Sequence, residues 1–142
     1  MKNSEHQNES KKPEIDPAAI VYGDTIYWIT VVATVIVLIG TILTFTTKGN
    51  YVDPAYMLTA IWEGKNVDEI WNAATGHTPD GHWYISQITT GDGLTMFGIA
   101  LGVFSVIPGI VGAGVLLLRD KQTLFGVLAM VAALITLGAM IP

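Results

Sequence analysis

The chain has 142 residues, a net charge of -5 and a mean hydropathy of +0.49, a balance outside the soluble globular class that indicates one compact membrane domain. Its seven lysines and arginines form no dense cluster, so nucleic acid is not an expected partner. The absence of cysteine excludes disulfides, thiolate metal sites, iron-sulfur clusters and covalently attached c-type haem.

The amino-terminal residues 1–20 are polar and mixed in charge, which predicts a flexible cytoplasmic tail ahead of a membrane domain at 21–142. Residues 25–47 carry no charge, and at about 1.5 Å per residue they cover the roughly 30 Å hydrocarbon core. This run is too long for the apolar part of a signal peptide and ends without a small-x-small cleavage pattern. We therefore expect a first span that stays in the mature protein.

The connection 48–93 carries the signals of two short amphipathic helices. Asp53 and Pro54 form a cap and first turn for one helix, and Asn66 with Glu69 forms a capping box for the other. The apolar sides are Ala55, Leu58, Ile61 and Trp62 in the first, and Val67, Ile70, Trp71 and Ala74 in the second. These sides can lie on the bilayer interface or cover a partner subunit.

His77, Asp80 and His82 are the one place where metal-ligand types gather. Two imidazoles and a carboxylate can hold a divalent metal, or one histidine can approach a haem held by another chain. The same Pro-Asp-Gly segment is ordinary turn chemistry, and the spacings of the strong zinc motifs are absent. This segment therefore has two interpretations, a metal or haem-proximal site and an ordinary turn.

Two further uncharged runs, 94–118 and 122–141, predict a second and a third transmembrane helix. Asp24, Asp92 and Asp120 stand before the three spans, where a carboxylate can accept from free amide groups. Pro108 lies in the middle of the second span, where it removes one backbone hydrogen bond and permits a bend.

Each span has one face of small or hydroxyl side chains, which lets helices approach closely in lipid. The faces can also line a pathway, but packing surfaces with hydroxyls bonded to the backbone one turn back are the ordinary case. The predicted helix-packing face consists of Gly98, Gly102, Ser105, Gly109 and Gly112 on the second span and of Thr30, Thr34, Thr41 and Thr44 on the first.

The lysines and arginines predict the orientation. The tail and the turn between spans two and three carry Lys2, Lys11, Lys12, Arg119 and Lys121. The long connection and the carboxyl end carry Lys48 and Lys65. We expect a multi-pass protein of the plasma or inner membrane, with a cytoplasmic amino terminus and an extracytoplasmic connection and carboxyl terminus.

The sequence thus predicts an all-α integral membrane protein with three transmembrane helices and no histidine, acidic or basic side chain inside a span. It favours a non-enzymatic subunit, with no cofactor of its own, that packs in a larger complex, such as a prokaryotic respiratory or electron-transfer assembly. Expected partners are membrane lipids and other integral subunits. The alternatives are a homo-oligomeric conduit lined by the threonine faces and an extracytoplasmic metal or haem-proximal site at His77 and His82.

Overall fold

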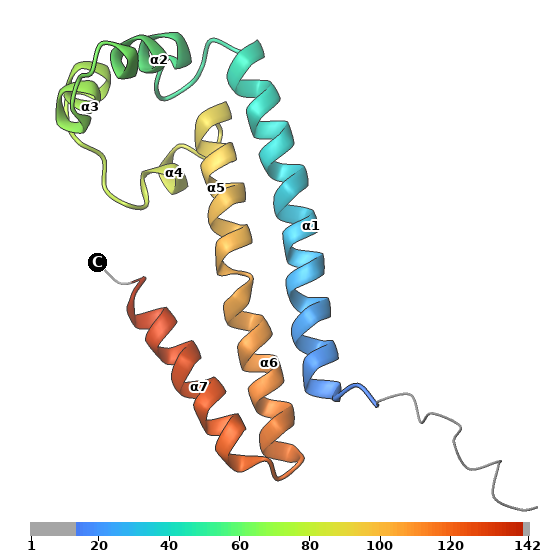
Figure 1. Ribbon diagram of the computed structural model, residues 1–142. Helices are drawn as coiled ribbons and strands as arrows, with labels where there is room; N and C mark the ends of the chain where they lie inside the picture. Colours follow the sequence, from blue (N-terminus) through green and yellow to red (C-terminus); the bar gives the residue numbers. More distant parts are fainter. Residues whose placement is uncertain (1–13, 141–142) are drawn as a thin grey trace, which may run out of the picture.

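The computed structural model describes residues 14–140, and this part of the chain is helical with no strand (Figure 1). Its elements are α1 (Pro17–Thr46), α2 (Pro54–Trp62), α3 (Val67–Thr75), α4 (Trp83–Ser86), α5 (Gly91–Phe104), α6 (Val106–Arg119) and α7 (Thr123–Gly138).

The long helix α1 begins eight residues before the predicted first span. Asp16 caps it, because its Oδ1 accepts from the backbone N–H of Ala18 at 2.8 Å, and Pro17 suits a first turn whose N–H would be unpaired. Asp24 therefore lies inside α1 and does not cap it, contrary to the prediction. The tail predicted for residues 1–20 ends earlier, and residues 1–13 lie outside the described part.

Helices α5 and α6 form one apolar rod with an interruption at Ser105. Pro108 has no N–H to donate to the carbonyl of Phe104, so the regular pattern breaks one turn before the proline. The Ser105 hydroxyl donates to the Gly102 carbonyl at 2.6 Å and pairs one backbone oxygen at the break. The interruption expected from Pro108 thus lies at Ser105.

Two stretches, α1 and the α5–α6 rod, are long and apolar enough to cross a membrane. Helix α7 is apolar but has 16 residues, about 24 Å at 1.5 Å per residue, which is less than the roughly 30 Å hydrocarbon core. The structure therefore gives two helices of spanning length and one shorter apolar helix in place of three full-length ones.

In the helical bundle, α1 packs along both α5 and α6, while α7 folds back and packs on α6 (Figure 1). The turn between α6 and α7 has Asp120 as the C-cap of α6, and Lys121 takes a left-handed backbone conformation with φ 62°. Asp120 thus ends one helix and does not cap the next, because the N-cap of α7 is Gln122 without a side-chain bond.

The connection between α1 and α5 contains the two helices that the caps predict. Asp53 accepts from the Ala55 N–H to start α2, and Asn66 and Glu69 form the reciprocal capping box of α3. Gly76 ends α3 with φ 82°, a conformation that glycine adopts without strain. The short helix α4 has no cap signal in the sequence and was not predicted.

Candidate functional site

The glycines of α5 form a close contact with α1. A Cβ atom on Gly98 would come 2.8 Å from Cγ2 and 2.9 Å from the backbone nitrogen of Val37. A Cβ on Gly40 of α1 would in turn meet the Oγ1 of Thr95 at 2.6 Å. Real Cβ atoms do not approach other atoms so closely, so at each of these points the glycine of one helix leaves room for the backbone and side chain of a residue on the other.

The contact continues along α6 with more room. A Cβ on Gly109 would lie 3.2 Å from Ile26 and Tyr22, and one on Gly112 would lie 3.1 Å from Val21. The contact at Gly102 is looser, since a Cβ atom on Gly102 would lie 3.6 Å from the Cβ of Ala33, which is ordinary van der Waals contact. The structure thus places the four glycines of the predicted packing face against α1, and Ser105 lies buried between them.

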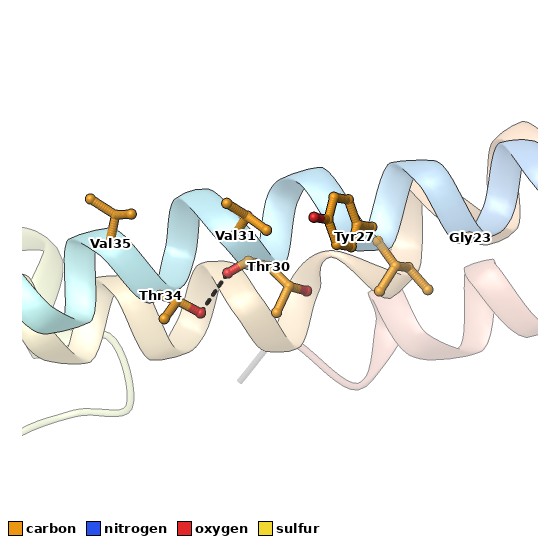
Figure 2. A pocket seen from close by; sticks show the side chains of 7 residues that line it. Gly23, Tyr27, Thr30, Val31, Thr34 and Val35 are labelled. Atoms are coloured by element: carbon orange, nitrogen blue, oxygen red, sulfur yellow. Dashed lines mark hydrogen bonds between the residues drawn. The ribbon is translucent and has the colours of Figure 1, made fainter.

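The four threonines of α1 do not share one surface. Thr41 and Thr44 are half-buried, and the backbone of Thr44 lies against Gly91 at the start of α5. Thr30 and Thr34 are exposed and line a shallow apolar groove with Gly23, Tyr27 and Val31 (Figure 2).

The hydroxyls of two threonines bond to the helix itself. Thr34 donates to the Thr30 carbonyl at 2.8 Å (Figure 2). Thr44 donates to the Gly40 carbonyl at 2.9 Å. Bonds of this kind satisfy the hydroxyl inside an apolar medium without a partner molecule. On α1, the side that meets α5 is formed by Ala33, Val37 and Gly40, and the outward groove lies about 90° around the axis at 100° per residue.

Asp92 joins the start of the connection to the start of α5. Its two carboxylate oxygens accept from the backbone N–H groups of Tyr51, at 3.0 Å, and Val52, at 2.9 Å, and Oδ1 also accepts from its own neighbour Gly93. Thr90, not Asp92, is the N-cap of α5. The predicted capping role of Asp92 is therefore partly replaced by a bond across forty residues, which no local pattern indicates.

An aromatic cluster holds the connection together. The rings of Tyr51 and Trp83 are stacked with centroids 5.0 Å apart, and Trp71 lies 5.9 Å from Trp83. Tyr84, the residue after Trp83 in α4, is buried. The tryptophan of α3 thus faces inward. Sequence reasoning missed this cluster because its members lie on three separate segments.

The apolar side of α2 faces outward. Leu58, Ile61 and Trp62 are more than half exposed, and Trp62 reaches 88%. The corresponding side of α3 is divided, because Ile70 is buried while Val67 is exposed. Of the two short helices, only α2 presents an open apolar surface.

The predicted metal site is not gathered into a cluster. In residues 14–140 no group of three histidine, aspartate or glutamate side chains could hold a metal ion. Asp80 accepts from the backbone N–H of His82 at 3.1 Å, and His77 Nδ1 lies 3.3 Å from the Thr75 carbonyl. The three residues thus serve the turn that follows α3, as Pro-Asp-Gly chemistry predicts.

Large apolar side chains cover the outer surfaces of the bundle. On α1 they include Trp28, Leu38, Ile42 and Phe45, and on α7 they include Leu124, Phe125, Leu134 and Ile135. Isolated apolar side chains on a surface are normal, but continuous faces of this size indicate contact with lipid or with protein.

The chain is similar in sequence to a known protein and matches a family model. A protein of Archaeoglobus fulgidus named "Uncharacterized protein" is 30% identical over 113 residues, which are 78% of this chain and 73% of the relative. No solved structure matches the chain. A family model matches residues 18–142, so its match includes the connection with α2, α3 and α4 as well as the long apolar helices. The chain belongs to the family that this model describes.

Proposed function

We propose that this chain is an integral membrane protein with three spans and a cytoplasmic amino terminus, and that it acts as a non-catalytic subunit of a larger membrane assembly. Its task is to pack against and position chains that carry the chemistry. The observation that carries the proposal is the outward groove of α1 around Gly23, Thr30 and Thr34, which the chain itself leaves unoccupied in the described residues.

The membrane part of the proposal rests on exposure. In the most apolar stretch of α1 only 11% of the residues are buried, and in that of the α5–α6 rod only 17% are buried. The core helix of a soluble protein, in contrast, is mostly buried. Apolar helices exposed in this way are stable in hydrocarbon, since nearly all backbone polar groups within a helix are paired. A short third span of α7 is accommodated by local thinning of the bilayer.

The subunit part rests on the two small-residue faces of α1. In lipid, helices associate through close contact at small residues, because lipid competes well for large apolar side chains. One face, with Ala33 and Gly40, is used by α5. The groove with Gly23, Thr30 and Thr34 is the second such face and suits a helix of another chain.

The absence of proton-transferring and metal-ligating side chains from the spans supports a non-catalytic role. The runs 25–47, 94–118 and 122–141 contain no histidine, acidic or basic residue. Proton relays, axial haem ligands and ion sites within a membrane use such residues. A partner that carries cofactors, such as a respiratory or electron-transfer complex, would supply what this chain lacks.

Co-purification tests the subunit role. The chain is purified in mild detergent from its native membrane, and every bound polypeptide is identified by mass spectrometry. We expect larger integral subunits to co-purify, to be lost from the double variant Thr30→Leu and Thr34→Leu, and to remain with the control Val32→Leu and Ile39→Leu on another exposed face of α1. A species made only of this chain would favour the homo-oligomeric conduit instead.

Single-cysteine labelling tests the three spans, because the natural chain has no cysteine. Gly49→Cys, Asp120→Cys and Gly138→Cys lie at exposed positions at three helix ends. We expect an impermeant maleimide to label the first and third in intact cells and the second only after lysis. If Gly138→Cys were labelled under the same conditions as Asp120→Cys, and not under those of Gly49→Cys, the result would contradict the third span.

A further inference from the structure

Helix α2 has one apolar side that the described part of the chain leaves uncovered. Leu58, Ile61 and Trp62 are 57%, 56% and 88% exposed. The opposite side is in use, because Ala60 is buried and the Tyr56 hydroxyl donates to a carbonyl of α3 at 3.4 Å. Helix α2 is thus attached to the rest of the connection by one side and open on the other.

The charges on either side of the first span mark the level at which α1 leaves the hydrocarbon. Residues 25–47 are uncharged, and they stand between Asp24 and Lys48. A charged side chain in the hydrocarbon core is costly, and a core of roughly 30 Å takes about 20 residues at 1.5 Å per residue. A span that begins after Asp24 therefore leaves the hydrocarbon close to Phe45.

The start of α5 gives the same level independently. Gly91, the first residue of α5, lies against the backbone of Thr44, and the acidic Asp92 follows it. Two segments that are distant in the sequence thus place their first charged residue beyond the span at one height. The outer boundary of the hydrocarbon lies at this height, beside Thr44.

Helix α2 lies at this boundary with its apolar side turned toward the outer surface of α1. The pocket at the corner between the two helices is lined by Phe45 of α1 and by Ala55 and Leu58 of α2. Trp62 lies on the same side as Leu58, one turn further along. Figure 1 shows α2 beside the end of α1 and running across its direction. The open side of α2 therefore continues the outer surface of α1, where Phe45 is 73% exposed.

The depth of this side decides between lipid and a soluble protein as its occupant. An amphipathic helix in the interface plane buries its apolar side roughly 5–10 Å into the boundary between head groups and acyl chains. Tryptophan is enriched at this depth, because its ring is apolar and its N–H is polar. A soluble protein would have to reach below the head groups to cover a surface that joins Phe45.

We propose that α2 is an interfacial helix that lies in the extracytoplasmic leaflet, with Leu58, Ile61 and Trp62 inserted between head groups and acyl chains. The lipid bilayer is the occupant of this surface, and it holds the connection at a fixed height on the membrane. This inference rests on the membrane location proposed above and does not depend on the partner subunit.

Spin labels on introduced cysteines test the depth of α2, because the natural chain has no cysteine. The full chain is reconstituted into liposomes with one nitroxide. Oxygen concentrates in hydrocarbon and a nickel chelate stays in water, so the ratio of their collision rates with the label reports depth. We expect this ratio to be at least about fivefold higher at Leu58→Cys and Trp62→Cys than at Asn72→Cys, an exposed polar position of α3.

A pair of charge variants tests whether the tryptophan holds α2 in the bilayer. With the label kept at Leu58→Cys, Trp62→Glu places a carboxylate at the boundary, and we expect the ratio to fall to within about twofold of that at Asn72→Cys. The matched control Asn72→Glu, with the same label, should leave the ratio unchanged. A ratio that is equal in the two variants overturns the insertion of Trp62.

A reference label on α1 separates failure of this inference from failure of the membrane location. Leu38→Cys lies in the middle of α1 at a position that is 58% exposed, and its label should show the highest ratio of all. Water-accessible labels on α2 together with a lipid-embedded label at Leu38→Cys overturn the interfacial helix and leave the span in place. A water-accessible label at Leu38→Cys overturns the proposed membrane location and, with it, this inference.

Photo-crosslinking in the native membrane tests lipid against an integral partner as the occupant. A photoreactive amino acid replaces Trp62 in the full chain, and the adducts are identified by mass spectrometry after illumination of the membranes. We expect phospholipid adducts. Adducts with a polypeptide and none with lipid would show that a protein covers α2, and would overturn the bilayer as its occupant.

Discussion

Gly98 of α5 lies directly against Val37 of α1, so that a Cβ atom on Gly98 would be 2.8 Å from the Cγ2 of Val37 and 2.9 Å from its backbone nitrogen. The backbone nitrogen cannot move without moving α1. This contact, together with Gly40 against Thr95, holds α5 alongside the second half of α1.

The replacement Gly98→Ala is expected to destabilise the α1–α5 pair by about 1–3 kcal/mol, the usual cost of overpacking. The matched control is Gly102→Ala, whose new methyl group would lie 3.6 Å from Ala33. Because alanine favours a helix over glycine by up to about 1 kcal/mol, this control should be neutral or slightly stabilising. Unfolding in mixed micelles, followed by circular dichroism, measures both, and equal stabilities would contradict the close contact.

Replacing Asp92 with alanine is expected to release the start of the connection from α5. The N–H groups of Tyr51 and Val52 would lose their acceptors, and a hydrogen bond to a charged group contributes about 1.5–3 kcal/mol. We expect their amide hydrogens to exchange about tenfold faster or more. Asp68→Ala, which removes an exposed acceptor of Thr78, serves as the control, and unchanged exchange in the Asp92 variant would argue against the bond.

The aromatic cluster predicts a difference between two tryptophans. Trp83→Leu removes the stacking on Tyr51 and the contact with Trp71, and aromatic pairs contribute about 0.5–1.5 kcal/mol each beyond their burial. We expect the far-ultraviolet signal of coupled indoles to disappear and the connection to become more sensitive to protease. Trp62→Leu should change neither, because Trp62 is 88% exposed on α2.

Pro108→Ala tests the origin of the break at Ser105. Alanine supplies the N–H that the Phe104 carbonyl lacks, so α5 and α6 should join into one straighter helix. Gly109 would then move from Tyr22, and disulfide formation between Gly109→Cys and Tyr22→Cys should fall severalfold in the Pro108 variant. Val103→Ala, on an exposed position of α5, should leave the yield unchanged. An equal disulfide yield with and without Pro108→Ala would assign the break to another cause.

Part of the fold could be read from local sequence because its causes are local. Asp53 with Pro54, and Asn66 with Glu69, define the starts of α2 and α3 through side chains within three residues, and the structure confirms both. The first span was predicted at 25–47, whereas α1 begins at Pro17, since hydropathy alone marks the uncharged run and not the helix. Helix α4 was not predicted because it has no side-chain cap.

The candidate surfaces, too, could be predicted only in part from the sequence. Helical spacing placed Gly98, Gly102, Gly109 and Gly112 on one face, and the structure puts that face against α1. Spacing also grouped four threonines, but α5 separates them, because Thr44 is covered at the start of α5 while Thr30 and Thr34 stay open to the outside. One helix cannot indicate which part of an arc its neighbour will cover.

By itself, the sequence determined the apolar, helical character of the chain, the caps of the short helices and the small-residue ridge of α5 and α6. These properties follow from hydration, backbone pairing and 3.6-residue periodicity, which act within a single helix. Only the tertiary structure decided that Asp92 binds Val52, that Trp71 meets Trp83, and that Lys48, Asn50 and Asp53 border one pocket. Such pairings depend on how separate helices dock, and docking is set by packing across the whole bundle.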